Sequence, residues 1–122
     1  MSITLITANV RGLVDSEKRR DVLARLRGLG TDQQLPRPAV VFLQETHVGR
    51  NDPEAWAAGV GPHYQAFFTP GGPATGVGTL VNRDAVPECR QLAFDPNGRW
   101  QLLQARFAQL GEVLLLNAGI SA

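Results

Sequence analysis

The sequence has few of the residues that stabilise secreted domains or anchor proteins in membranes. Cys89 is the only cysteine among 122 residues, which excludes an intrachain disulfide and any C-x-x-C metal site. No apolar run approaches the length that crosses a bilayer, and the N-terminus lacks the basic segment and long apolar core of a signal peptide. These absences predict an intracellular protein that is neither secreted nor membrane-bound.

Strong charge of either sign is also missing. The chain has 12 basic and 11 acidic residues, so it lacks the marked positive charge that is typical of many nucleic-acid-binding domains. Lys18 is the only lysine, and the other basic residues are all arginines. Arginine favours planar phosphate and carboxylate partners, but a compositional bias of the genome explains the same skew equally well. Hydrophobic residues make up 43% of the chain, enough for the core of one domain or part of one.

The first third of the chain alternates strand and helix patterns. A strand is predicted at 3–8 and a continuous apolar strand at 39–43, which is typical of a strand covered on both faces. Between them a helix begins after Asp15 or Ser16, with Val22 and Leu26 on one face. This order predicts a crossover unit in an α/β layer.

The rest of the chain reads mainly as short strands. A short helix is predicted at 53–58, where Pro53 takes the first helical position. Strand-like runs follow at 63–69, 77–82, 91–94, 100–107 and 113–117. The turn stretches PGGPATG (70–76), DPNG (95–98) and QLGE (109–112) separate several of them and predict antiparallel pairing.

Polar residues follow both predicted strands of the first third. In VVFLQETH the apolar run passes directly into Gln44, Glu45 and Thr46, and Asn9 follows the first strand. Parallel neighbouring strands would bring Asn9 and Glu45 to the same edge, where open α/β sheets bind ligands. A carboxylate beside an amide suits Mg²⁺, which keeps several water ligands. The alternative is that Glu45 and Thr46 only begin a solvated loop.

Four sequence blocks resemble, in order, motifs of the endonuclease/exonuclease/phosphatase superfamily. They are ITANVRGL, VVFLQETH, TGVGTLVNRD and DPNGRWQLLQARF. The resemblance is strongest to the apurinic-type endonucleases of non-LTR (LINE) retrotransposons. It implies about half of a DNase I-like α/β sandwich, with one mixed sheet flanked by helices. It also implies a hydrolase that nicks DNA with Mg²⁺ or Mn²⁺, and residence in the nucleus.

The resemblance assigns roles to single positions. It implies that Glu45 is the metal-binding catalytic carboxylate and that Asn9, the second catalytic residue, helps to hold Glu45 or the phosphate. Four further residues are implied around the substrate, namely Arg11, Gln44, Thr46 and His47. Arg99 matches a motif arginine for which the resemblance implies a structural role.

The chain also departs from the family pattern. Gly119 and Ala122 stand where the family has an aromatic residue and an asparagine, and neither His47 nor His63 follows an aspartate. The later motifs of the family, an Asp-x-Asn pair, a further aspartate and a Ser-Asp-His sequence, are expected beyond residue 122. We therefore expect residues 1–122 to be the N-terminal half of the domain, truncated before the second catalytic motif set and inactive as a nuclease alone.

A half domain has a structural consequence. We expect an inner sheet face that includes Val41, Leu43, Leu80, Leu103 and Leu115 to lose its partner. The missing C-terminal half, or self-association through this face, would then cover it. Two alternatives to a nuclease remain: a non-catalytic relic or interaction module that keeps only the fold, and a phosphatase or sphingomyelinase-type relative, against which the L-Q-E-T-H stretch argues.

Overall fold

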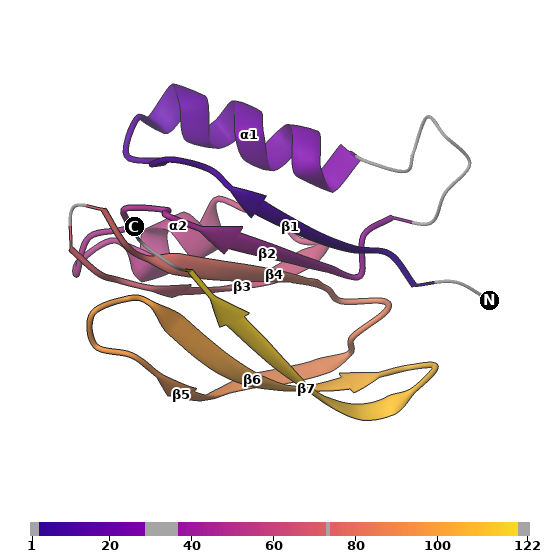
Figure 1. The fold of residues 1–122 in the computed structure, drawn as a ribbon. Coiled ribbons are helices and arrows are strands. Elements are labelled where there is room, and N and C mark those ends of the chain that lie inside the picture. Colours follow the sequence, from indigo (N-terminus) through magenta and orange to yellow (C-terminus); the bar gives the residue numbers. More distant parts are fainter. Residues whose placement is uncertain (1–2, 29–36, 73, 120–122) are drawn as a thin grey trace.

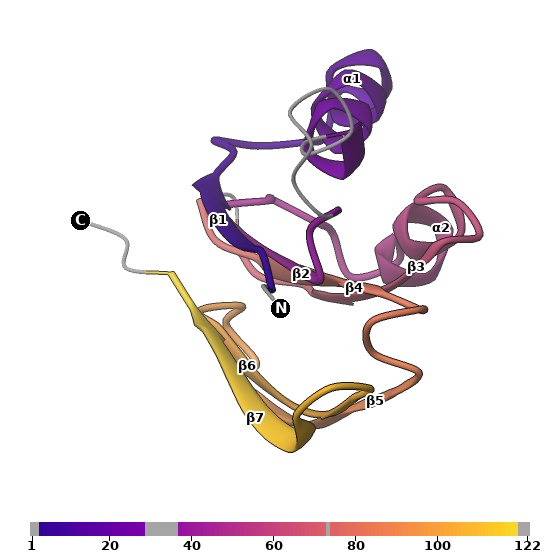
Figure 2. The same cartoon turned by 90° about the vertical axis from the view of Figure 1, so that its right-hand side faces the viewer.

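The described residues, 3–28, 37–72 and 74–119, form two stacked sheets with helices against one of them (Figures 1 and 2). Their helices and strands follow the chain as β1 Leu5–Asn9, α1 Ser16–Gly28, β2 Val40–Gln44, α2 Pro53–Ala58, β3 Tyr64–Thr69, β4 Val77–Asn82, β5 Glu88–Phe94, β6 Trp100–Phe107 and β7 Gly111–Ala118. In this computed structural model, the helix layer, the first sheet and the second sheet lie in that order (Figure 2).

The first sheet has four strands in the order β1-β2-β4-β3. The pair β1–β2 is parallel and α1 connects it, which confirms the predicted crossover. The pairs β2–β4 and β3–β4 are antiparallel, so the sheet is mixed. In the parallel pair Asn9 lies opposite Gln44, and both strands therefore end at the same edge of the sheet.

The second sheet is antiparallel, with the order β5-β6-β7. Its strands are those predicted at 91–94, 100–107 and 113–117, with β5 and β7 each extending beyond the predicted runs. A mixed sheet with helices on one face and an antiparallel sheet on the other confirms the α/β sandwich class.

The prediction of an uncovered inner face was wrong. Val41, Leu43 and Leu80 are fully buried on the helix side of the first sheet, in the cluster that contains Leu23 of α1 and Trp56 of α2. Side chains alternate along a strand, so neighbours of these residues point to the opposite face. There the strands β5–β7 supply a second sheet instead of extending the first.

The contact between the sheets buries the other two residues of that prediction. Leu103 of β6 is fully buried and Leu115 of β7 is 7% exposed, and they pack in one cluster with Val40 and Val81 of the first sheet. This apolar half of the interface also contains Phe107.

Apolar residues are exposed instead on the outer face of the second sheet. Alternation places Trp100, Leu102, Leu114 and Leu116 on this face, with Leu102 opposite Leu116 in the register. Leu114 and Leu116 are 63% and 62% exposed, and no described element covers the outer face of the second sheet (Figure 2). We call these four residues the outer apolar patch.

Helix α1 is capped by Asp15, one of the two predicted candidates. The Asp15 carboxylate accepts hydrogen bonds from the backbone N–H groups of Glu17 and Lys18, at 2.9 and 3.0 Å. The guanidinium of Arg19 lies 4.5 Å from the centre of the Trp56 ring and so links α1 to α2. Within the described part of the chain, neither helix is long and apolar enough to span a membrane.

The Asp15 cap predicts a specific pH dependence of stability. Its pKa is lowered from 3.8 by the amide N–H donors of Lys18 and Glu17, which bind the ionised form. A depressed folded-state pKa gives stability that is present above the unfolded value and is lost as the pH falls through the folded value. Asp15→Asn keeps an acceptor oxygen but does not titrate, so its Tm should fall less than that of the wild type between about pH 4 and pH 2. Thermal melts followed by circular dichroism measure the difference, and parallel pH profiles for both proteins would contradict it.

Candidate active site at the strand ends

The backbone at the end of β2 runs between two loops and is hydrogen-bonded to both of them. The N–H groups of Val10 and Gly12 donate to the carbonyls of Gln44 and Glu45, at 3.0 and 2.6 Å. On the other side, the N–H groups of Thr46 and His47 donate to the carbonyls of Gly76 and Thr75, at 3.0 and 2.9 Å. Residues 44–47 are therefore held from both sides, and we refer to them as the clamped segment.

Three non-glycine residues in and beside this segment have left-handed backbones. Their φ angles are 52° for Arg11, 53° for Glu45 and 60° for His47. Such conformations cost energy and persist where the surroundings impose them, often at functional sites. The left-handed turn at Glu45 departs from the strand geometry of β2 and sets the direction in which its carboxylate leaves the strand end.

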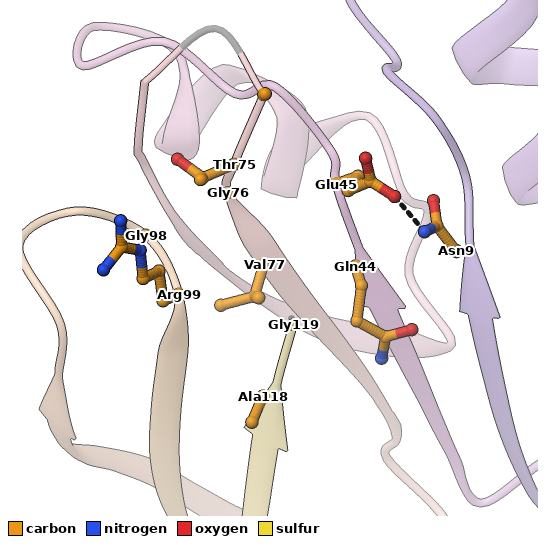
Figure 3. A pocket seen from close by; sticks show the side chains of 11 residues that line it. Asn9, Gln44, Glu45, Thr75, Gly76, Val77, Gly98, Arg99, Ala118 and Gly119 are labelled. Carbon is orange, nitrogen blue, oxygen red and sulfur yellow. Dashed lines mark hydrogen bonds between the residues drawn. The ribbon is translucent and has the colours of Figure 1, made fainter. Parts of the chain in front are cut away.

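Asn9 holds that carboxylate. Its side-chain Nδ2 donates a hydrogen bond to Glu45 Oε2 (Figure 3), and its Oδ1 accepts one from the backbone N–H of Arg11 at 3.1 Å. Both polar ends of the amide are therefore used within the protein. This geometry assigns Asn9 to orienting Glu45 and leaves the second carboxylate oxygen of Glu45 without a hydrogen bond from the described residues.

The two side chains lie in a cavity of about 220 Å³ at the end of the sandwich, between the two sheets (Figure 3). The first sheet and its loops contribute most of the lining, and the second sheet contributes the β5–β6 turn and the end of β7. The lining residues used below are Asn9, Gln44, Glu45, Thr75, Gly76 and Arg99. Arg99 is exposed and comes from the sheet opposite Glu45, so the cavity has a cation on one wall and a carboxylate on the other.

The six predicted site residues do not all reach the cavity. Asn9, Gln44 and Glu45 line it. Thr46 is fully buried, and its hydroxyl accepts a hydrogen bond from the N–H of Val48. The remaining two, His47 and Arg11, lie outside the lining.

His47 packs against a glycine behind the clamped segment. A Cβ placed on Gly12 would lie 2.6 Å from His47 Nδ1, so the ring rests on the bare backbone of that residue. Arg11 is exposed, and its carbonyl accepts a hydrogen bond from Lys18 Nζ at 3.3 Å. Both residues border the site at the side of β1.

The sequence patterns did not predict that the loop before β4 and the β5–β6 turn form one wall of the cavity. Loop 70–76 and turn 95–98 meet through bonds from Gly76 N to Gly98 O and from Thr75 Oγ1 to Asn97 O, at 2.9 and 2.7 Å. A Cβ on Gly98 would lie 2.6 Å from the Cα of Gly71. The glycines of both turn stretches were the available signal, because glycine also permits two backbones to approach closely.

An Asp-x-Asn spacing occurs once in the described chain, at Asp95–Asn97, and it has a local role. Asp95 Oδ2 accepts a hydrogen bond from the N–H of Arg99, and its carbonyl accepts one from Gly98. These are the contacts of a turn, as the DPNG sequence predicts. Neither Asp95 nor Asn97 lines the cavity.

The donor set at the site limits which metal ion it fits. In the described ranges no three His, Cys, Asp or Glu side chains come together. The described residues offer a metal ion the Glu45 carboxylate, because the side chain of Asn9 is already hydrogen-bonded to Glu45 and to the backbone of Arg11. One carboxylate fits a hard divalent ion such as Mg²⁺ that keeps most of its water ligands, and does not fit an ion that requires a full protein cage.

The stacked sheets and the strand-end cavity define a DNase I-like α/β sandwich, and the sequence identifies the family. The family model for the Endonuclease/Exonuclease/phosphatase family matches residues 6–117. The chain belongs to this family. Comparison with curated protein sequences gave no match.

Solved structures share the fold at low sequence identity. The AP endonuclease LMAP from Leishmania major is 22% identical with a TM-score of 0.70, and 98% of this chain covers 40% of it. An AP endonuclease from Archaeoglobus fulgidus (18%, TM-score 0.55) is covered to 41% by 98% of this chain. The 3′ phosphatase NExo from Neisseria, solved with a product DNA hairpin (17%, TM-score 0.54), is covered to 41% by 96% of it. The chain thus spans about two fifths of each structure.

The contact between the two turns predicts that alanine substitution destabilises the protein to different extents at two glycines with positive φ. Gly98 (φ 71°) meets Gly71, whereas Gly111 (φ 79°) has nothing within 4 Å of an added Cβ. Alanine strains the backbone at both positions, but only Gly98→Ala also forces the turns apart. Gly98→Ala should lower the free energy of unfolding by about 1–3 kcal/mol more than Gly111→Ala. Urea denaturation measures both variants, and equal losses would exclude the steric contact.

Proposed function

We propose that the chain is the N-terminal part of a divalent-metal-dependent phosphodiesterase that nicks DNA, of the retroelement endonuclease type. The observation that carries the proposal is the Glu45 carboxylate, held by Asn9, facing a cavity that Arg99 also lines. A metal-binding carboxylate and an arginine on opposite walls suit a phosphodiester between them. The family supports hydrolysis of this class, and the retroelement subtype rests on the L-Q-E-T-H resemblance.

Each residue has a part in this proposal. Glu45 holds Mg²⁺ or Mn²⁺, and Asn9 fixes the rotation of its carboxylate. Arg99 donates hydrogen bonds to a non-bridging phosphate oxygen from the second sheet, a more direct role than the structural one implied by the resemblance. Arg11 and His47 border the path of the DNA strand. When bound, the ion polarises a phosphoryl oxygen and stabilises the leaving group.

Among the described residues that line the cavity, there is no histidine that could act as a general base. Neither His47 nor His63 lines the cavity, and Glu45 is the only carboxylate among its described lining residues. General acid–base catalysis typically contributes about 10²–10⁴ in rate. We therefore propose that this chain alone binds the metal ion without useful nuclease activity, and that residues 1–122 act as the N-terminal half of the catalytic domain.

A non-catalytic interaction module is the second candidate. The outer apolar patch favours it, because a cluster of exposed Leu and Trp on one sheet face is typical of an interface. In either case we propose that this patch is covered in the working protein, by the C-terminal half of the domain or by a second copy of the chain.

Metal binding tests the role of Glu45. Wild-type chain should bind Mn²⁺, observed as loss of the free-ion EPR signal, and Glu45→Gln should abolish the binding. Asn9→Ala should weaken it by about 10- to 100-fold, because an orienting partner of a metal ligand is lost. Glu54→Gln makes the same charge change at an exposed site on α2 and should bind like the wild type. Equal binding by Glu45→Gln would remove the proposal.

Supercoiled plasmid provides the catalytic readout for the same variants. With Mg²⁺ the chain alone should leave the plasmid intact. Nicking that disappears in Glu45→Gln would mean that the chain is an active nuclease by itself. Nicking that persists in Glu45→Gln would indicate a contaminant.

Self-association tests the outer apolar patch. Leu114 and Leu116 are exposed on one face, so the chain should form dimers or larger species as its concentration rises. Replacing both residues by lysine should shift it to monomers in sedimentation velocity. Leu110→Lys is the control, because Leu110 is equally exposed at 62% but lies in the β6–β7 turn. A wild type that stays monomeric throughout would contradict the prediction.

A further inference from the structure

The space between the two sheets is polar near the cavity. Its other half is apolar, built around Leu103, Phe107 and Leu115. In the polar half each of the seven strands contributes one hydrogen-bonded side chain. In strand order these are Thr7, Gln44, Thr69, Thr79, Gln91, Gln101 and Asn117. We call this set the polar layer.

The hydrogen bonds of the layer form one connected path. Gln44 binds Thr7 and Asn117. Asn117 then donates to the Thr79 hydroxyl, which donates to Gln101 at 2.6 Å. Beyond Gln101 the path ends at Thr69 and Gln91. In the described part of the chain no buried side-chain N or O atom lacks a partner, so every buried polar atom of the layer is hydrogen-bonded.

Asn117 is the central residue of the path. It is 1% exposed, and its Nδ2 lies 3.2 Å from Leu43 O, 2.9 Å from Gly78 O and 3.1 Å from Thr79 Oγ1. Leu43 and Gly78 are opposite each other in the β2–β4 register. One amide of β7 therefore ties two neighbouring strands of the other sheet together.

The path reaches the site through Gln44. Asn117 Oδ1 accepts a hydrogen bond from Gln44 Nε2 at 3.0 Å, and Gln44 lines the cavity directly before Glu45. Asn117 itself does not line the cavity. It thus holds the Leu43 carbonyl and the Gln44 side chain, both of which lie at the end of β2 just before the left-handed turn at Glu45.

An apolar layer would hold two sheets together at least as well. Buried polar groups cost free energy unless every one is paired, and apolar packing has no such condition. Hydrogen bonds differ from apolar contacts in their narrow preference for distance and direction. A polar layer at this end of the sandwich therefore fixes where the strand ends lie, which apolar packing does less sharply.

We propose that the polar layer positions the Glu45 strand end, with Asn117 as its principal positioning residue. The relevance of this position to catalysis rests on the proposed function. The layer transmits the position of the second sheet to Glu45 through Gln44, so that the walls carrying Glu45 and Arg99 keep a constant separation. Gln101, Thr69 and Gln91 form the part of the layer that is remote from Glu45.

The test compares Asn117→Leu with Leu103→Ala. Leucine approximates the shape of asparagine but makes none of its hydrogen bonds, and Leu103→Ala weakens the apolar half of the same interface. Hydrogen–deuterium exchange is measured in the metal-free chain, under conditions where both variants are folded. The reporters are the amides of Val10 and Gly12, which bond to Gln44 and Glu45.

Asn117→Leu should accelerate exchange at Val10 and Gly12 by about tenfold or more, relative to Leu103→Ala at matched global stability. Equal acceleration in both variants, or none, would overturn the positioning role. If Asn117→Leu does not fold, Thr79→Val carries the same test. It removes the hydroxyl that accepts from Asn117 with little change of shape.

Mn²⁺ binding on the same samples separates the two proposals. Weaker binding in Asn117→Leu than in Leu103→Ala, with the exchange result above, supports both. Faster exchange at Val10 and Gly12 without any Glu45-dependent Mn²⁺ binding by the wild type supports the positioning role and rejects the proposed function. Mn²⁺ binding that is lost in Glu45→Gln but is equal in the wild type, Asn117→Leu and Leu103→Ala rejects the effect of the layer on the site and keeps the proposed function.

Discussion

The clamped segment after β2 is the constraint on which the site depends. Its backbone is bonded on one side to the loop after β1 and on the other to the loop before β4. Glu45 holds a left-handed conformation there, in a segment whose backbone is joined to the two loops by five hydrogen bonds. The direction of the carboxylate therefore follows from the parallel pairing of β1 with β2 and the antiparallel pairing of β2 with β4, and the side chain of Asn9 completes it.

The second sheet contributes to the site in two ways. Its β5–β6 turn packs on the loop before β4 and brings Arg99 to the cavity. This close packing requires residues without a side chain at Gly71 and Gly98. Beneath the cavity, Asn117 and Gln101 bind polar groups of the first sheet. The sandwich thus combines an apolar half, which supplies most of the burial energy, with a polar half that restricts the geometry.

Much of the fold could be predicted because periodicity and turn chemistry are local. The crossover of β1, α1 and β2, the Pro53 helix, the turn at 95–98 and a turn between β6 and β7 all agree with the sequence patterns. The separation into two sheets could not be predicted. Alternation along β6 indicates that Leu103 is buried, but it does not indicate which strand Leu103 packs against. The predicted inner face therefore combined residues of two different faces: Val41 and Leu43 face helices, whereas Leu103 packs with Val40 between the two sheets.

The sequence by itself determined which side chains follow the strand ends, and hence that Asn9 and Glu45 meet at one edge. It does so because strand direction and the lengths of β1 and β2 are encoded locally. Tertiary structure alone decided that Arg99 shares their cavity, that Thr46 is buried and that Asn117 reaches Gln44 across 73 residues of chain. These contacts join two sheets whose relative placement depends on the packing of the whole core, and no local pattern contains that information.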